Sequence, residues 1–445
     1  MRPLVYVAFA LSFLMARLLI VPTPVGQLST FRISILFVFF GLVVTWIRGR
    51  KLVVGSGRRL VYFFVFWLAW ALISVYWAED FTGWLRAVYF IGSGVVAIIA
   101  MFATMTERRH LLNLFGIATI AFGAMGLLGA YEVVTGHYPF LTGETNLEVY
   151  AAQDLPVAWA GNVNDFGLAM LFAIPSAYVS FMNSKNVAWR VVCAGVIALS
   201  AVLCVATSSR GTLLGLMVLF GAYLLLNLRR SGVVLAVLTA VVLVALAVPG
   251  VLQSFILRLG QVLQFNFDGA GGSDLERQNL IRNGFVFLQD TLGFGTGAGN
   301  IEYWMAQNPP YPTYGILNIH NWWMEILVAY GVFIFAAYLL SYWSLIRRFF
   351  TGWRRRHDRF TTSVSEAMLC CLLSFVISAV SSSSNIMKEW LWCYFGLFIL
   401  SYRAVGATLG KAVGLVSATE PGEGMQMCSS SQEGPVTTAS LGGAK

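Results

Sequence analysis

Charged side chains are scarce in this sequence. Only 11% of its 445 residues are Asp, Glu, Lys or Arg, whereas 58% are hydrophobic, and the mean hydropathy is +0.74. A soluble protein carries about 25% charged residues, so this chain has too few to cover a water-exposed surface. The composition excludes a soluble globular protein and predicts an all-α, polytopic integral membrane protein.

Cysteine pairs, metal-ligand motifs and internal repeats are also lacking. None of the six cysteines stands in a CxxC or Cys/His spacing, so neither a disulfide framework nor a zinc site is expected. Most of them lie in apolar runs, where a thiol behaves as a small hydrophobic group. We expect no metal and no cofactor. The absence of a repeat disfavours transporter folds that are built from duplicated halves.

The net charge of +9 does not indicate nucleic-acid binding, because the basic residues occur in short clusters between apolar runs. No basic stretch is long enough to hold a duplex. A bilayer core about 30 Å thick requires about 20 apolar residues per helix, which predicts about twelve transmembrane helices. The runs lie near residues 3–21, 33–47, 60–77, 86–103, 111–130, 160–182, 190–207, 211–227, 233–250, 321–345, 363–380 and 390–404.

The first run follows a basic residue, as in a signal peptide, but it reaches spanning length and has no convincing small-residue cleavage site. We interpret it as a retained helix. Lys and Arg then fall in every second connection, whereas the stretch 131–159 has none. Cytoplasmic connections carry the excess of basic residues, so both termini are predicted to be cytoplasmic.

Four regions follow from this topology. Residues 1–159 would hold the first five helices and an outer loop, and residues 160–345 would form a core with a large outer loop at 251–320. Residues 346–404 would supply the last helices. The tail, 405–445, is rich in Gly, Ser, Thr and Glu and is expected to be a disordered cytoplasmic segment.

Charged groups at helix ends on one side of a membrane are candidates for function. Arg210 lies in a short turn of small residues between two apolar helices, on the predicted outer side. It could be an arginine that extends to the membrane interface. A planar guanidinium in such a turn also suits bidentate phosphate recognition.

Arg277 lies in an amphipathic segment, Asp274 to Gln289, of the large outer loop. On a helical wheel it falls at the centre of the apolar arc, where the helix should pack, and a charge there needs an anion. A buried structural ion pair is the alternative. Arg282 falls on the polar side and is expected to be solvated. The arc comprises Leu280, Ile281, Phe285, Phe287 and Leu288, and the polar side comprises Gln278, Asn279, Arg282, Asn283 and Gln289.

His320 precedes Asn321 and two tryptophans at the outer mouth of the tenth predicted helix. Histidine is the side chain best suited to act as a general base near neutral pH, although a lone His at an aromatic interface can equally be structural. Glu325 lies one turn deeper and could orient a neighbour. The aromatic residues around this position could form a membrane-interface belt or faces for sugar rings.

The segment from Gly293 to Asn300 carries alternate glycines. A nucleotide-binding loop is rejected, because no βαβ context surrounds it and no Lys-Ser/Thr follows. The better interpretation is a tight turn that allows another backbone to approach closely.

Taken in order, these segments resemble the O-antigen ligase and polymerase superfamily, and most of all its teichuronic acid and exopolysaccharide polymerase branch. The resemblance is concentrated between about 160 and 345. Its motifs are Gly161-Asn162-Val163-Asn164-Asp165-Phe166, Ser208-Ser209-Arg210-Gly211, Arg277-x-x-Leu280-Ile281-Arg282-Asn283-Gly284, Gly293-Phe294-Gly295-Thr296-Gly297, His320-Asn321-Trp322-Trp323-Met324-Glu325-Ile326-Leu327 and Tyr330-Gly331.

This resemblance implies a metal-independent, inverting glycosyltransferase of the GT-C kind in the bacterial cytoplasmic membrane. Such an enzyme moves a glycan from a polyprenyl (undecaprenyl) diphosphate carrier to an acceptor glycan or glycolipid at the outer face, with other polysaccharide-assembly membrane proteins as candidate partners. It further implies that Arg210 and Arg277 hold the diphosphate and that His320 is catalytic. Supporting roles would fall to Arg282, Asn164, Asp165, Asn321 and Glu325.

The residues themselves agree with this chemistry, because a diphosphate leaves as an anion and needs positive charge rather than an acid. Ligase and polymerase are not separated by these motifs. A transporter or lipid-linked oligosaccharide flippase is the main alternative, but it calls for polar groups near helix midpoints, which are mostly bare here. A non-catalytic membrane scaffold would not need Arg277 on an apolar arc.

Overall fold

The computed structural model describes residues 1–14, 21–23, 26–49, 51–141, 147–228, 273–307, 309–382 and 385–418. Residues Met1–Leu409 form one compact unit, and Gly410–Lys445 form a second, of which residues up to 418 are described as the end of a helix. The account below concerns the first unit.

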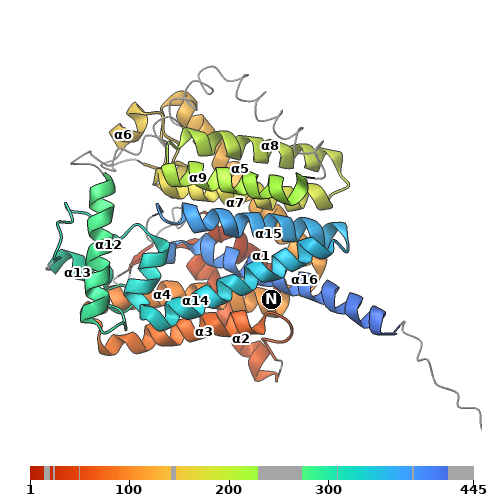
Figure 1. Cartoon of the computed structure of the whole chain (residues 1–445), viewed down its shortest axis with the longest axis horizontal. Coiled ribbons are helices and arrows are strands. Elements are labelled where there is room, and N and C mark those ends of the chain that lie inside the picture. The colour runs from red at the N-terminus through yellow and green to blue at the C-terminus, as the bar shows by residue number, and fades with distance from the viewer. Residues whose placement is uncertain are drawn as a thin grey trace, which may run out of the picture. The chain divides into compact units, whose positions relative to one another are not determined.

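Helices make up most of the described chain (Figure 1). The longer ones are α2 (Thr30–Ile47), α3 (Arg58–Ile73), α4 (Phe81–Thr104), α5 (Arg108–Thr135), α7 (Val163–Asn183), α8 (Val187–Ala206), α9 (Arg210–Asn227), α12 (Ser273–Asp290), α14 (Trp322–Arg355), α15 (Arg359–Ser378) and α16 (Glu389–Ala418). The shorter elements are α1 (Arg2–Ser12), α6 (Leu147–Ala152), α13 (Ile301–Gln307), the 3-10 turns η1 (Ser74–Tyr76), η2 (Ala158–Ala160) and η4 (Asn385–Met387), and the strands β1 (Val21–Thr23) and β2 (Gly26–Leu28).

The prediction of a polytopic membrane protein is confirmed. Within the described ranges, nine helices are long and apolar enough to cross a bilayer: α2, α3 with η1, α4, α5, α7, α8, α9, α14 and α15. The predicted run at 233–250 lies outside the described residues, as does most of the predicted tail. The final predicted run at 390–404 is the start of α16, which continues to Ala418, beyond its expected end.

The first predicted run, 3–21, does not form one helix of spanning length. Helix α1 covers 11 residues and ends at Ser12, whose hydroxyl donates to the Phe9 carbonyl. A helix of that length is only about 16 Å long, roughly half of a bilayer core. The chain then forms an antiparallel β1–β2 pair, with Val21 opposite Leu28. Pro22 favours an extended conformation at the residue before it, Val21, in agreement with the strand β1 there.

The predicted outer loops, 131–159 and 251–320, also contain more helix than expected. Helix α5 continues to Thr135, and α6 and α13 are short helices inside the two predicted outer loops. These short elements have too few residues to carry a clear helical period, so the sequence pattern could not reveal them.

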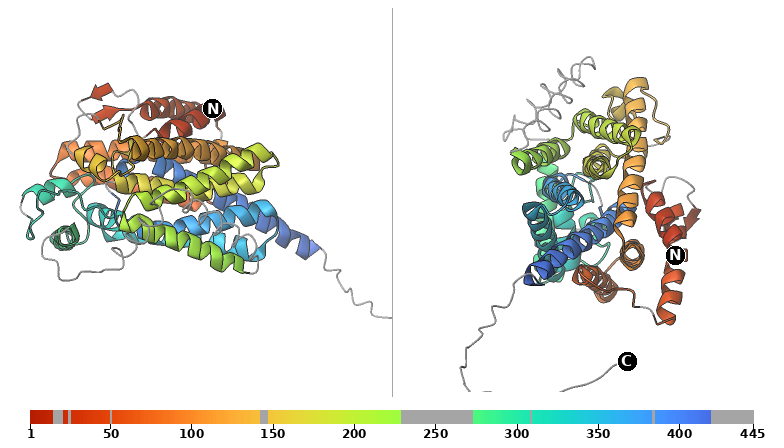
Figure 2. Two further views of the ribbon diagram at one scale, coloured as in Figure 1. Left: turned by 90° about the horizontal axis from the view of Figure 1, so that it is seen from above. Right: turned by 90° about the vertical axis from the view of Figure 1, so that its right-hand side faces the viewer.

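Helices α7 and α15 form the most buried part of the membrane bundle. Helix α7 packs against α5, α8 and α15, and α15 packs in turn against α9 and α14 (Figures 1 and 2). Small side chains allow this close packing, because a Cβ at Gly167 of α7 would overlap Thr212 of α9. The five cysteines in the described chain are free and buried, consistent with their predicted role as small apolar groups.

Helix α14 is broken at Gly331, whose φ of 78° and ψ of 180° are not helical. The break frees the carbonyls of Val328 and Ala329, which accept hydrogen bonds from the amides of Thr296 (2.8 Å) and Gly297 (3.1 Å). A Cβ at Gly295 would lie 2.7 Å from the Gly331 amide nitrogen. The glycine-rich segment is therefore a close backbone contact, as predicted, and it satisfies backbone groups that the membrane could not.

Candidate functional site

The candidate residues gather at the end of the bundle where α7, α9 and α14 begin and α15 ends, here called the His320 end. Helices α12 and α13 lie at this end, beside the start of α14 (Figures 1 and 2). The residues that precede α4 also reach it, because the Asp80 amide donates to Asn300 at 2.7 Å.

His320 lies just before α14, in a conformation that few residues other than glycine adopt. Its φ is 48°, and its amide donates to the Asn318 side chain at 2.8 Å. Asn321 then begins α14 as its N-cap, accepting hydrogen bonds from the amides of Trp323 and Met324. Left-handed backbone at a non-glycine residue is uncommon and costs free energy, so it is often found where a side chain must be aimed.

The imidazole of His320 is half-buried and has several charged neighbours. Burial lowers the pKa of His320, and the positive charges of Arg277 and Lys388 lower it further, while Asp165 and Glu302 act in the opposite direction. The net result is a pKa below the usual value for histidine. A lower pKa favours the neutral ring, the form in which it can accept a proton.

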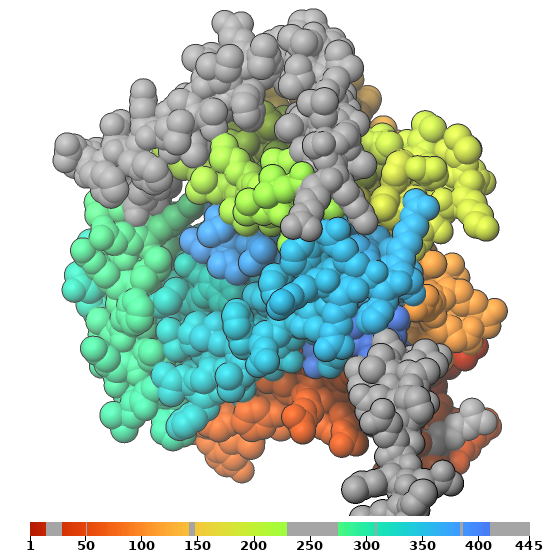
Figure 3. All heavy atoms as spheres, turned by 45° about the vertical axis from the view of Figure 1, so that its right-hand side comes forward, coloured from red at the N-terminus to blue at the C-terminus, as the bar shows by residue number. Residues whose placement is uncertain are grey.

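Arg277 is thus brought close to His320, but the predicted helical wheel of its segment is wrong in part. The buried face of α12 includes Leu280 and Phe287 together with Asn279 and Asn283, whereas Phe285 is 49% exposed. Arg277 itself is half-buried. Figure 3 shows α12 and the first part of α14 side by side.

The reason for the difference is that the two asparagines bind the backbone of residues 311–312. Asn283 donates to the Tyr311 carbonyl at 2.9 Å and accepts from the Tyr311 amide at 2.8 Å, and Asn279 donates to the Pro312 carbonyl at 3.1 Å. Polar side chains can be buried when they are fully hydrogen-bonded, and a wheel that sorts by hydropathy misplaces them. Arg282 is exposed, as predicted, and lies over the Tyr311 ring at 5.6 Å.

Asp165 forms a buried ion pair that the sequence alone did not suggest. Its carboxylate lies 3.1 Å from the Lys388 amine, and both side chains are 9% exposed. The Ser382 hydroxyl donates to the same carboxylate at 2.7 Å. Asp165 stands in the first turn of α7, where the helix dipole also favours a negative charge. The backbone amide of Asn164, one residue earlier, donates to the side chain of Asn162, the N-cap of α7.

Arg210 is the exposed first residue of α9 and follows its N-cap, Ser209. The next residue, Gly211, packs so closely on Ser381 that a Cβ there would overlap the hydroxyl. Ser381 adjoins Ser382, which binds Asp165. Arg210 therefore lies at the His320 end, near the Asp165–Lys388 pair. Arg277 lies at the same end, on α12.

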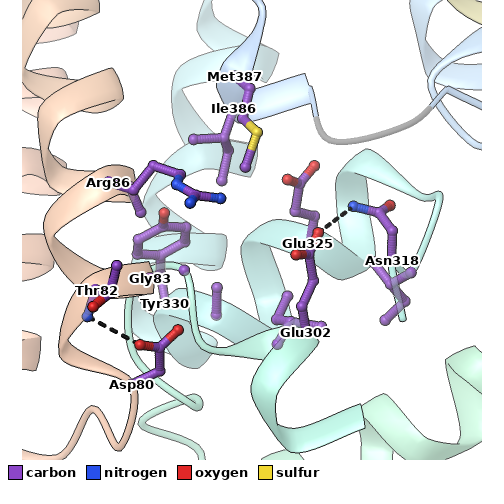
Figure 4. Close-up of a pocket in the computed structure, with 15 residues that line it drawn as sticks. Asp80, Thr82, Gly83, Arg86, Glu302, Asn318, Glu325, Tyr330, Ile386 and Met387 are labelled. Atoms are coloured by element: carbon purple, nitrogen blue, oxygen red, sulfur yellow. Dashed lines mark hydrogen bonds between the residues drawn. The ribbon is translucent and has the colours of Figure 1, made fainter. Parts of the chain in front are cut away.

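A cavity of about 120 Å³ adjoins the His320 loop (Figure 4). Asn318 and Ile319, the two residues before His320, form part of its wall, and Glu325 lines it from α14. Across the cavity, Arg86 extends from α4 toward Tyr330, as Figure 4 shows. Glu325, which the sequence suggested could orient a neighbour, is 9% exposed and faces this cavity.

Sequence reasoning missed Arg86, Lys388 and Glu302. Arg86 and Lys388 stand at or just outside predicted helix ends, so the criterion that selected Arg210 could have selected them, whereas Glu302 lies inside the predicted outer loop and carried no such signal. The aromatic residues around His320 also differ in burial, which a single interface belt would not predict. Trp322 is fully buried and donates to the Tyr338 hydroxyl at 2.8 Å, so it belongs to the core rather than to an interface belt.

Across the described ranges, no three His, Cys, Asp or Glu side chains are grouped as a metal site requires.

Comparison with known proteins identifies two similarities. Residues 195–339 match the family described as O-antigen ligase. Over 358 residues the chain is 25% identical to the teichuronic acid biosynthesis protein TuaE of Bacillus subtilis (strain 168), an alignment that covers 78% of this chain and 72% of that protein. Both matches support the resemblance to the O-antigen ligase-like superfamily.

The matched segment contains Arg210, Arg277, His320 and Glu325. These similarities, together with the apolar helices, support an integral membrane protein of the bacterial inner membrane and suggest a membrane enzyme of polysaccharide assembly. The resemblance seen in the sequence motifs is thereby confirmed.

Proposed function

We propose that this protein is a metal-independent, inverting glycosyltransferase of the GT-C kind. It would transfer or polymerise glycan units from a polyprenyl (undecaprenyl) diphosphate donor onto an acceptor sugar at the outer face of the membrane. The observation that carries the proposal is the half-buried imidazole of His320, on which the charge of Arg277 acts, in the segment that matches the O-antigen ligase family. About twelve spans with both termini cytoplasmic, as the basic clusters indicate, would put this end of the bundle outside.

The reaction requires one proton acceptor and an anion site. His320 takes the proton from the acceptor hydroxyl while its oxygen bonds to the anomeric carbon of the donor sugar. The bond from that carbon to the diphosphate breaks, and its electron pair leaves with the diphosphate. Attack on the face opposite the leaving group inverts the anomeric configuration.

Arg277 and Arg210 supply the positive charge that stabilises the leaving diphosphate. A guanidinium can bind a phosphate through two parallel hydrogen bonds, which also orients the donor. The positive charge of Arg277 has a second effect, because it keeps the pKa of His320 low and the ring unprotonated. The Asp165–Lys388 pair adds a buried charge pair whose two members act on His320 with opposite signs.

An in vitro assay tests the proposal. The donor is the polyprenyl-diphosphate oligosaccharide extracted from host cells that lack this gene, and the purified full-length protein is supplied in detergent micelles. Chain lengthening would identify a polymerase, and one transfer to a different membrane glycolipid would identify a ligase. No product from either acceptor would overturn the proposed activity.

The variants His320→Ala and Arg277→Ala should each lose product formation. Arg109→Ala is the matched control, because Arg109 is exposed at the opposite end of the bundle, where it pairs with Glu107 at 2.7 Å. All three proteins should elute as the wild type does in size-exclusion chromatography. Full activity of both site variants would show that the residue assignment is wrong.

A further inference from the structure

The cavity beside the His320 loop has a lining that suits a neutral, hydroxyl-rich ligand. Three carboxylates, those of Asp80, Glu302 and Glu325, line it together with a single guanidinium, that of Arg86. A diphosphate would meet more negative than positive charge here, and like charges repel in a confined site. Sugar hydroxyls, in contrast, can donate to carboxylates and accept from a guanidinium.

Two polar groups in the cavity wall have hydrogen-bonding capacity to spare. The Tyr330 side chain is fully buried, and its hydroxyl has no hydrogen-bond partner in the described chain. Within the same part of the chain, the Arg86 guanidinium makes neither a hydrogen bond nor an ion pair, although it lines a cavity with three carboxylates. Figure 4 shows the Tyr330 hydroxyl directed toward Arg86.

A buried hydroxyl without a partner costs free energy, so its presence calls for an explanation. A ligand oxygen between Tyr330 and Arg86 would give the buried Tyr330 hydroxyl a partner and would also bind the exposed Arg86 guanidinium. The cavity volume of about 120 Å³ leaves room for the edge of one sugar ring. Ile386 and Met387 line the same cavity and offer an apolar surface for the ring carbons.

The position of the cavity relative to His320 indicates which sugar it would hold. Its wall includes Asn318, whose side chain accepts from the His320 amide and donates to Glu302 at 3.3 Å. The cationic groups Arg277 and Lys388, which also act on the imidazole, are not part of the cavity lining. The anionic donor and a neutral sugar can therefore occupy different surroundings next to one base.

We infer that this cavity is the acceptor-sugar subsite, in which Arg86 and Tyr330 bind a ring oxygen or hydroxyl and Glu302 and Glu325 accept from neighbouring hydroxyls. The inference rests on the proposed glycosyl transfer and assigns the acceptor to a definite part of the molecule. It identifies Arg86 and Tyr330 as specificity-determining residues.

Steady-state kinetics with a soluble acceptor test this assignment. The acceptor probe is the free oligosaccharide released by mild acid from the host's polyprenyl-diphosphate lipid. It has no diphosphate, so it can accept a glycan but cannot donate one. The lipid-linked oligosaccharide serves as donor, and the acceptor KM and donor KM are measured separately.

The variants are Arg86→Ala, Tyr330→Phe and the distant control Arg109→Ala. Removal of a charged hydrogen-bond donor should raise the acceptor KM by roughly tenfold or more in Arg86→Ala, and loss of the hydroxyl should raise it by a smaller factor in Tyr330→Phe. The donor KM should stay within twofold of the wild type. Tyr330→Phe keeps the buried ring and removes only a hydroxyl without a partner, so this variant should fold at least as stably as the wild type.

Each outcome separates the two proposals. If the wild type transfers glycan and both variants keep the wild-type acceptor KM, the subsite assignment is wrong and the proposed function stands. An increase in donor KM alone would place the donor in the cavity and would also overturn the inference. If the wild type gives no product with soluble or membrane acceptors, the proposed function fails, and the inference fails with it.

Discussion

Replacement of Gly331 by alanine should destabilise the protein strongly, because two independent costs coincide there. With φ at 78° and ψ at 180°, the residue occupies a region of backbone space that is almost restricted to glycine, and a side chain there costs about 1–3 kcal/mol. A Cβ would also lie 2.5 Å from the Phe294 carbonyl oxygen, closer than real contacts allow.

Relief of that contact would move the glycine-rich segment away from α14. The Val332 amide, which donates to the Gly293 carbonyl at 2.9 Å, would then lose its partner, at a cost of about 1 kcal/mol or more. The total loss in free energy of unfolding should be about 3–5 kcal/mol, in the range that only such special positions reach.

Thermal unfolding in detergent, followed by tryptophan fluorescence, measures the effect against two controls. Gly221→Ala lies in the helical part of α9 with open space around it and should cost nothing. Gly136→Ala has a φ of 65° and open space, so it should cost only the backbone strain, about 1–2 kcal/mol. If Gly331→Ala melts no lower than Gly136→Ala, the close contact does not contribute to stability and the reasoning is wrong.

Three further predictions concern the His320 end and the last turn of α5. Because Glu302 raises the pKa of His320, Glu302→Gln should lower that pKa further, and the acidic limb of the pH–rate profile should move to lower pH; an unchanged limb would argue against His320 as the base. Asp165→Asn should cost about 3–5 kcal/mol, since it removes the carboxylate that lies 3.1 Å from the buried Lys388 amine, and the added change Lys388→Met should recover much of the loss in a double-mutant cycle of unfolding midpoints. Glu132→Gln should lower the unfolding midpoint by an amount equivalent to about 1–3 kcal/mol, because the buried carboxylate accepts two backbone amides at 2.9 and 2.7 Å; an unaltered midpoint would contradict this.

The sequence predicted the membrane bundle well because the physical rule is simple. Each long apolar run in the described chain from 33 to 227 corresponds to a helix, since backbone groups in lipid must be hydrogen-bonded within the segment. The glycine-rich segment was also interpreted correctly as a close backbone approach. What it approaches could not be predicted, because the break in α14 at Gly331 depends on contacts between residues far apart in the chain.

The candidate site was only partly predictable. Arg277 and His320 were selected separately, and their proximity depends on how α12 packs at the start of α14. Asn279 and Asn283 were assigned to the polar side, whereas both are buried against the backbone of residues 311–312. Hydropathy sorts side chains by their affinity for water and carries no information about a specific hydrogen-bond partner.

The His320 end is held together largely by backbone hydrogen bonds and close glycine contacts. The amides of Thr296 and Gly297 bind carbonyls of α14, and the Trp322 amide binds the Ala379 carbonyl at the end of α15. His320 adopts its left-handed conformation between these anchors. Rigid backbone support keeps a side chain such as the His320 imidazole oriented at little cost in side-chain entropy. The cations and carboxylates around His320 are not part of these backbone and glycine contacts. A change of acceptor specificity should therefore be obtainable by substitution at the cavity wall without loss of the fold.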